Sequence, residues 1–294
     1  MIKYIMMAKV FTNKADEVEN SICKKFHKTL LAKFCRAICE YDLIQPNDKI
    51  AVCISGGKDS MLMAKLFQEL KRHNKIPFEL VFMVMDPGYS PENRAIIERN
   101  AQMLAVPITI FETDIFNSVF KIEKSPCYLC ARMRRGHLYH QAKLLGCNKI
   151  ALGHHYDDVI ETILMGMLYG GQIQTMMPKL HSTNFAGMQL IRPMYLIREQ
   201  DIIRWRDENQ LTFIQCACKF TAENHQTDNL SSKRKAVKQL IARLKETDPQ
   251  IERNIFRSME NVNLATVITY KDKDGHYHNF KDDYRPKKIK DWNF

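Results

Sequence analysis

The sequence lacks any uninterrupted apolar stretch that approaches the ~20 residues of a membrane-spanning helix. Its N-terminal segment also lacks the small-residue cleavage site of a signal peptide, because a brief apolar patch gives way directly to acidic residues. Both absences argue against a membrane partner and against secretion. We therefore expect a soluble, cytoplasmic protein.

No linker rich in glycine or proline divides the chain, which has 11 glycines and 10 prolines among its 294 residues. Internal repeats and low-complexity blocks are absent as well, which excludes a repeat architecture. The hydrophobic fraction of 45% is enough for one large domain with modest appendages. We predict an N-terminal tail and basic helix over 1–45, a central domain over 46–220 and a C-terminal helical and basic region over 221–294.

The nine cysteines are an odd number, and they do not read as the framework of a disulfide-stabilised protein. Several lie inside apolar patterns in which another small hydrophobic residue would serve, namely Cys35, Cys39, Cys53 and Cys147. This usage is typical of a reducing compartment with free thiols or metal thiolates.

Basic residues outnumber acidic ones, and the formal net charge is +11 at pH 7. Such a charge indicates attraction to a polyanion, with nucleic acid the usual candidate and an anionic membrane surface the lesser one. Charge alone does not decide the partner, because many basic proteins bind nothing acidic. Some of it lies in a predicted amphipathic helix over 17–41. Its apolar positions recur every four residues, at Ile22, Phe26, Leu30, Phe34 and Ile38.

The rest of the chain alternates between short apolar runs and helical patterns. Strands are predicted at 49–54, 79–85, 108–111, 149–152 and 189–191, and helices at 60–72, 91–104, 132–145, 157–168 and 199–209. Two further helices, at 232–246 and 248–262, precede a basic, aromatic tail. This pattern predicts an α/β fold with an open, mainly parallel sheet, helices on both faces, an N-terminal helix and a C-terminal helical extension.

The stretch SGGKDS, residues 55–60, lies between the first predicted strand and the helix that follows it. In a parallel sheet this turn is the usual phosphate site, because glycines let backbone N–H groups approach an anion and the helix presents its positive end. Ser55 and Ser60 can hydrogen-bond phosphate oxygens, Lys58 can neutralise them, and Asp59 can hold Mg²⁺. The pattern does not match Walker A. The same residues would also suit a tight turn with Asp59 or Ser60 as the helix N-cap.

A second polar stretch, Gly153-His154-His155-Tyr156-Asp157-Asp158, follows a later strand and precedes Glu161 and Thr162. A histidine and paired acids there place a metal-binding or general-base cluster on the same rim as the SGGKDS turn. Asp157 would cap a helix in a purely structural interpretation, and we expect one member, His155 or Tyr156, to pack. Asp158 is the predicted catalytic carboxylate.

Together the two stretches resemble the PP-loop ATP pyrophosphatase superfamily, which has a Rossmann-like fold. Its members bind ATP and adenylate a substrate, releasing pyrophosphate. The second stretch is similar to the G-H-x-x-D-D-x-x-E-T signature of the tRNA-modifying branch. The resemblance implies that 46–220 is an ATP-binding catalytic domain.

Cysteines form two further groups, Cys127-Tyr128-Leu129-Cys130 and Cys216-Ala217-Cys218. A C-x-x-C pair at the start of a helix places two sulfurs on one side of the first turn, which suits a shared metal or a redox dithiol. From the residues alone, four cysteines favour structural zinc over an iron-sulfur cluster.

The stretches SPCYLCARMRRGHLY and IRPMYLIREQDIIR, which begin at Ser125 and Ile191, resemble the tRNA 2-thiocytidine synthetase family. That resemblance favours an iron-sulfur cluster over structural zinc. It implies a 4Fe-4S cluster on three cysteines, with one iron open to carry sulfur. Cys127 and Cys130 match the family pattern, and Cys216 is the predicted third ligand. The family typically has C-x-x-C at the last place, so Cys218 stays an alternative ligand that would also put the open iron in doubt.

The resemblance implies ATP-dependent tRNA thiolation, with adenylation of the cytidine oxygen before sulfur transfer. ATP-binding residues are then Ser55, Gly56, Gly57, Lys58, Asp59, Ser60, Gly153 and His154, with Mg²⁺ at Asp59 and Asp158. Asp59, Asp158 and Arg134 are the predicted catalytic residues, and Arg132, Arg134 and Arg135 the predicted RNA contacts. Arg132 suits a solvated basic helix face equally well. The partners implied are tRNA and a sulfur donor such as a cysteine desulfurase, and a homodimer is left open.

Two other functions remain. One is a tRNA-adenylating enzyme of the lysidine-synthetase or amidating type, with the cysteines on structural zinc. The other is a zinc-bearing nucleotide-binding module without catalysis. The colour and metal content of an anaerobic preparation distinguish both from the iron-sulfur hypothesis.

Overall fold

The computed structural model describes residues 14–73, 76–113, 115, 126–214 and 229–283. Cys216 and Cys218 lie outside these residues. Around Cys127 and Cys130 the backbone is described and the side chains are not.

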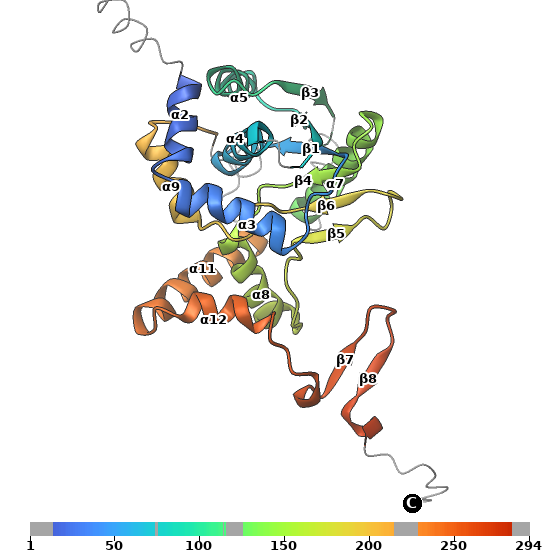
Figure 1. The fold of residues 1–294 in the computed structure, drawn as a ribbon. Coiled ribbons are helices and arrows are strands. Elements are labelled where there is room, and N and C mark those ends of the chain that lie inside the picture. Colours follow the sequence, from blue (N-terminus) through green and yellow to red (C-terminus); the bar gives the residue numbers. More distant parts are fainter. Residues whose placement is uncertain (1–13, 74–75, 114, 116–125, 215–228, 284–294) are drawn as a thin grey trace, which may run out of the picture.

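Six strands form one sheet in the order β3-β2-β1-β4-β6-β5 (Figure 1). Their bounds are β1 Asp48–Ile54, β2 Phe78–Asp86, β3 Ile108–Glu112, β4 Lys149–Ala151, β5 Lys179–His181 and β6 Gln189–Ile191. Every neighbouring pair is parallel except β5 and β6, so the predicted open, mainly parallel sheet is confirmed. The antiparallel edge strand β5 was not predicted, because Lys-Leu-His has no apolar run to mark it.

Helices alternate with these strands and extend beyond them at both ends of the chain (Figure 1). They are α2 Lys14–Cys23, α3 Ala32–Glu40, α4 Lys58–His73, α5 Pro91–Met103, α7 Pro126–Leu144, α8 Tyr156–Gly170, α9 Glu199–Glu208, α11 Asn229–Thr247 and α12 Ile251–Ser258. Short 3-10 turns lie at Leu264–Thr266 and Phe280–Asp283. In the part of the chain that the structure describes, no helix is long and apolar enough to span a membrane.

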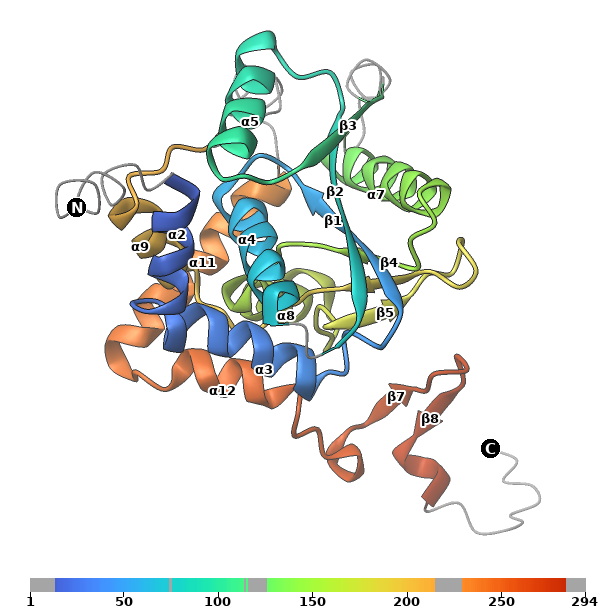
Figure 2. The same ribbon diagram turned by 45° about the horizontal axis from the view of Figure 1, so that its top comes forward.

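Both faces of the sheet are covered, as the strand sequences require. Alternate residues of a strand point to opposite faces. Ile50, Val52 and Ile54 of β1 are buried in a core with α2, α3, α4, α5 and α9. Ala51 and Cys53 are buried in a second core against α7. Figure 2 shows α4 and α5 on one side of β1 and β2, and α7 on the other.

The C-terminal helices pack against α8 and form a third core (Figure 1). Val159 and Ile163 of α8 are buried there with Val237 and Ile241 of α11 and Phe256 of α12. The two predicted C-terminal helices are therefore present, and they attach to the helix that carries the second polar stretch.

The predicted N-terminal helix is not continuous. A π-helical turn at His27–Leu31 separates α2 from α3. An apolar residue every four positions drifts around an α-helix, which has 3.6 residues per turn. The π turn has more residues per turn, so it brings the apolar positions back to one side of the helix. The buried residues on that side are Ile22, Phe26, Leu30 and Phe34.

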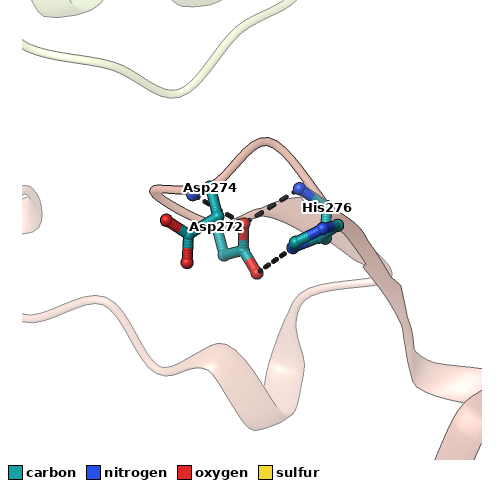
Figure 3. A group of neighbouring side chains, drawn as sticks. All are labelled: Asp272, Asp274 and His276. Atoms are coloured by element: carbon teal, nitrogen blue, oxygen red, sulfur yellow. Dashed lines mark hydrogen bonds and ion pairs between the residues drawn. The ribbon is translucent and has the colours of Figure 1, made fainter.

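Beyond α12 the chain forms a hairpin of two short strands, β7 Thr269–Lys271 and β8 Tyr277–Asn279, where we predicted only a basic tail. Figure 3 shows how its turn is held. Both the Asp274 and the His276 backbone N–H groups donate to Asp272 Oδ1 at 2.9 Å. The His278 ring hydrogen bond is the largest cause that lowers the pKa of Asp272 to about 2. These interactions close the turn within the hairpin.

Candidate active site

The turn between β1 and α4 is closed by its own serines. The Ser55 N–H donates to Ser60 Oγ at 3.1 Å, and Ser60 Oγ donates to the Gly57 carbonyl at 3.0 Å. Ser60 is buried, so its hydroxyl proton serves the turn. The backbone N–H groups at the start of α4 lie at the carboxyl edge of the sheet, where a helix terminus favours an anion.

Gly56 is required by both its conformation and its surroundings. Its φ is +84°, and a Cβ there would lie 2.6 Å from Ile97 Cγ1 and 2.7 Å from Ile214 Cδ1. The turn is therefore pressed against α5 and the chain that follows α9.

We expect Gly56→Ala to lower the free energy of unfolding by about 1–3 kcal/mol, because alanine at this φ is strained and its methyl group clashes. Gly170→Ala is the matched control, since a Cβ at Gly170 meets nothing within 4 Å. That variant should be neutral or stabilising by about 0.5–1 kcal/mol. Urea unfolding of the two proteins measures the difference, and equal midpoints would contradict the tight packing of the turn.

The second polar stretch approaches the same turn. A Cβ at Gly153 would lie 3.3 Å from the Asp59 carbonyl carbon and from Ser60 N, so the loop after β4 passes close to the first turn of α4. His155 is buried and caps α8: Asp158 N–H donates to His155 Nδ1 at 3.4 Å, and His155 N–H donates to Asp158 Oδ2 at 3.0 Å. His155 therefore packs, as predicted for one residue of this stretch, and Tyr156 packs as well, because its ring stacks on Phe256 with centroids 4.5 Å apart.

The two loops meet at a cavity of about 360 Å³. Eight of the predicted site residues line it: Ser55, Asp59, Ser60, Arg134, Arg135, Gly153, His154 and Asp158. Apolar walls come from the ends of the strands and from Leu138 of α7. Residues from four separate stretches of the sequence therefore line one hollow at the carboxyl edge of the sheet, where ligands bind in open α/β folds.

The predicted residues that do not line this cavity include Gly56, Gly57, Lys58 and Arg132. Gly57 and Lys58 line a separate cavity with Glu199, whose Oε1 lies 3.3 Å from Lys58 Nζ. Arg132 lines a third cavity, on another side of α7. The spacing of the sequence did not separate Arg132 from Arg134, although two positions along a helix do not share a face.

Asp59 and Asp158 differ in how fully they are already bonded. Asp59 Oδ1 is buried and accepts no hydrogen bond, although Lys58 Nζ lies 3.2 Å from it. Asp158 uses Oδ2 for the cap of α8 and receives Arg234 Nη1 on Oδ1 at 3.1 Å. A carboxylate oxygen without a hydrogen bond at the edge of a polar cavity fits a hard cation such as Mg²⁺.

Arg234 and Arg192 are site residues that the sequence interpretation did not single out. Arg234 comes from α11, and its Nε also lies 3.6 Å from Glu161 Oε2. No sequence signal pointed to it, because 76 residues separate it from Asp158. Arg192 lay inside the quoted IRPMYLIRE stretch but was given no role.

Arg192 fixes the protonation of His154. Its Nε–H donates to His154 Nδ1 at 3.4 Å, and its own side chain is buried. Burial, reinforced by the Arg192 charge, lowers the pKa of His154 from 6.5 to about 4. His154 is therefore neutral at pH 7 with its proton on Nε2, because Nδ1 accepts the arginine hydrogen.

We expect this histidine to make stability fall in acid. The unfolded chain binds a proton near pH 6.5 and the folded one only near pH 4, so its contribution is complete above pH 6.5 and is lost as the pH falls towards 4. Urea midpoints at pH 7.5 and 5 measure the loss, which should be smaller in His154→Gln.

Described residues next to both cysteine motifs lie at this edge of the sheet. Positions 127, 130 and 134 follow the spacing of one face of α7, and Arg134 lines the cavity. On the other side, Ile214 reaches Gly56 two residues before Cys216. Among the described cysteines, four are free thiols, namely Cys23, Cys39, Cys53 and Cys147.

Comparison with known proteins shows which family this chain belongs to. The family model of the PP-loop domain matches residues 23–221, more than half of the chain. The chain belongs to the PP-loop family. The SGGKDS turn lies within the matched residues, and we call it the PP-loop.

Within the PP-loop family, the chain is similar to several curated enzymes that share one name. A tRNA-cytidine(32) 2-sulfurtransferase from Alcanivorax borkumensis is 35% identical over 257 residues, which cover 85% of this chain and 87% of that protein. The enzyme of that name from Vibrio cholerae is 38% identical over 81% of this chain and 75% of its own length. The one from Neisseria meningitidis is 39% identical over 68% of this chain, and the match spans 62% of that protein.

Among solved structures, the U34-tRNA thiolase NcsA from Methanococcus maripaludis, determined with its [4Fe-4S] cluster, has a similar fold. The TM-score is 0.60 at 22% identity, over 78% of this chain and 77% of that one. The likeness supports the predicted Rossmann-like architecture.

Proposed function

We propose that this protein is an ATP-dependent tRNA sulfurtransferase that converts a cytidine to 2-thiocytidine. The observation that carries the proposal is the shared cavity of the PP-loop, the GHHYDD loop and Arg134. It brings a phosphate site and a carboxylate pair together with the helix that begins with Cys127 and Cys130. The likeness to three tRNA-cytidine(32) 2-sulfurtransferases supports the choice of substrate.

ATP binding follows from the loop geometry. The backbone of Gly56 and Gly57 and the start of α4 would hold the phosphates, and the Ser55 hydroxyl lies beside them. Asp59 and Asp158 would hold Mg²⁺, which neutralises phosphate charge when bound. Neutral His154 can donate from Nε2 to an oxygen in the cavity.

The first chemical step would be adenylation. The C2 oxygen of cytidine attacks the α-phosphorus of ATP, the bond to the β-phosphate oxygen breaks, and pyrophosphate leaves. Arg134 is placed to stabilise the negative charge that develops on phosphate. The step turns the C2 oxygen, a poor leaving group, into AMP, a good one.

Sulfur replacement would complete the reaction. Cys127, Cys130 and Cys216 would hold a 4Fe-4S cluster, which would supply reactive sulfur when bound. Cys218 is the alternative third ligand. AMP leaves C2 as a sulfur atom at the oxidation level of sulfide forms the carbon-sulfur bond, so each turnover consumes one ATP and one such sulfur atom. The sulfur comes from a donor such as a cysteine desulfurase, whose persulfide sulfur reaches that level by taking two electrons from thiols, and we propose a reducing, cytoplasmic setting and allow a homodimer.

Incubation of the anaerobic protein with tRNA, ATP, Mg²⁺ and sulfide tests the function directly. We expect 2-thiocytidine in digested tRNA, with AMP and pyrophosphate formed in equal amounts. A lysidine-type or amidating product, with zinc in the protein, would support the alternative enzyme. ATP binding without any tRNA product would instead support a nucleotide-binding module.

The basic surface gives a further prediction. We expect the association constant for tRNA to fall steeply with salt, because each neutralised phosphate releases counterions. Filter binding between 50 and 200 mM salt should show about a 10³-fold loss for six or more phosphate contacts. A flat salt dependence would mean that the +11 charge serves another purpose.

A further inference from the structure

The third cavity, which Arg132 lines, lies beside the proposed active site on another side of α7. Its volume is about 670 Å³, within the range of pockets that hold small ligands. One wall is α7, with Arg132 and Arg135, and the other is the segment from β5 to Phe185. Arg135 also lines the active-site cavity, so the two hollows share a side chain.

The described residues leave the charge of this cavity uncompensated. Its basic lining residues are Arg132, Arg135 and His181, and no carboxylate lines it. Neither arginine forms an ion pair with any residue of the described part of the chain. The cavity beside Lys58 is different, because Lys58 pairs there with Glu199 and Arg206 with Asp207. Unpaired guanidinium groups in a hollow favour an anion, and phosphate suits their fork of donors.

The remaining lining residues suit a nucleobase. His181, Thr183 and Asn184 are exposed and offer hydrogen-bond donors and acceptors. The rings of Tyr139 and Phe185 also line the cavity, and they stack with centroids 5.2 Å apart. Proteins recognise unpaired RNA bases through this combination of aromatic surface, polar side chains and arginine.

We infer that this cavity is a subsite for the RNA nucleotide that flanks the modified cytidine, with Arg132 and Arg135 on its phosphates and Asn184 at its base. The inference rests on the proposed function. Because Arg135 borders both cavities, a strand with one base in the active site has its neighbour within reach of the other cavity. The cavity would thereby help to select the sequence around the target base.

The test combines protein variants with altered RNA. Asn184→Ala should raise the tRNA Kd about tenfold, since a base-edge contact discriminates at that scale. A transcript with an abasic nucleotide beside the target cytidine should bind the parent about tenfold more weakly. On that transcript, Asn184→Ala should cause no further loss, and its ATP affinity should match the parent on either RNA.

Charge provides the second arm. Arg132→Gln should weaken binding to intact and abasic transcripts alike, and reduce the slope of log K against log salt by about one. Lys143→Gln is its control, because Lys143 is an exposed cation on the same helix outside both cavities. That variant should change the Kd less than twofold.

The subsite is refuted if the losses of tRNA affinity caused by Asn184→Ala and by the abasic nucleotide add, whichever side of the cytidine the abasic nucleotide is on. Thiolation of tRNA by the parent protein would in that case leave the proposed function intact. A second equivalent of AMP or inorganic phosphate that binds the parent and is lost in Arg132→Gln would also overturn it, because a free nucleotide or phosphate would then be the ligand. Failure of the parent to bind or thiolate tRNA would refute the proposed function itself.

Discussion

Asp59→Ala should lower pyrophosphate release by about 100-fold or more while the protein stays folded. Asp59 Oδ1 is buried at the cavity edge without a hydrogen bond, so its loss removes a proposed Mg²⁺ ligand and leaves no backbone group unsatisfied. Release is measured with a coupled phosphate assay. Thermal unfolding checks the fold, and its midpoint should shift little.

Asp207→Ala is the matched control for charge. Asp207 is an exposed carboxylate whose described partner is its neighbour Arg206, and it lies outside the active-site cavity. This variant should retain full turnover. Unchanged ATP turnover in Asp59→Ala would end the assignment of a catalytic PP-loop to this chain.

The cysteines give the second large effect. Cys127→Ala, Cys130→Ala and Cys216→Ala should each lose the visible absorbance of the cluster and all tRNA thiolation, because thiolates are the ligands that iron-sulfur clusters require. Cys218→Ala should retain both. ATP affinity should survive in all four variants, since the PP-loop is a separate phosphate site.

Two outcomes would change this assignment. If Cys218→Ala destroys the cluster and Cys216→Ala spares it, the third ligand lies two residues further on and the mechanism stands. If both are needed and the purified protein carries zinc without iron, sulfur transfer fails and the structural-zinc alternative replaces it.

Local patterns in the sequence predicted the parts of the fold that depend on neighbouring residues. The apolar strands and the turn that begins at Ser55 follow from spacing alone, and parallel strands then bring Gly153 and Asp158 to the same edge. The PP-loop and GHHYDD stretches thus predicted most of one cavity. Their spacing could not show that Asp158 is also half of a helix cap.

The parts that were missed depend on partners distant in sequence or on weak local signals. Arg234 meets Asp158 only because α11 packs on α8, and no periodicity encodes that approach. Arg132 and Arg134 were grouped by adjacency, although the helix turns them to different cavities. The hairpin after α12 has strands of three residues each, too short to show an alternating pattern.

The link between Arg234 and Asp158 also bears on how this family can diversify. The family match ends at residue 221, yet α11 supplies an arginine to a carboxylate of the proposed site. A protein cut after residue 221 would keep every motif but leave Asp158 and Glu161 as neighbouring acids without that cation, and would uncover the apolar face of α8. Exchanging C-terminal regions between relatives should therefore change the charge of the active site. Selection on catalysis can then act on the C-terminal region, as well as selection on how that region packs against α8.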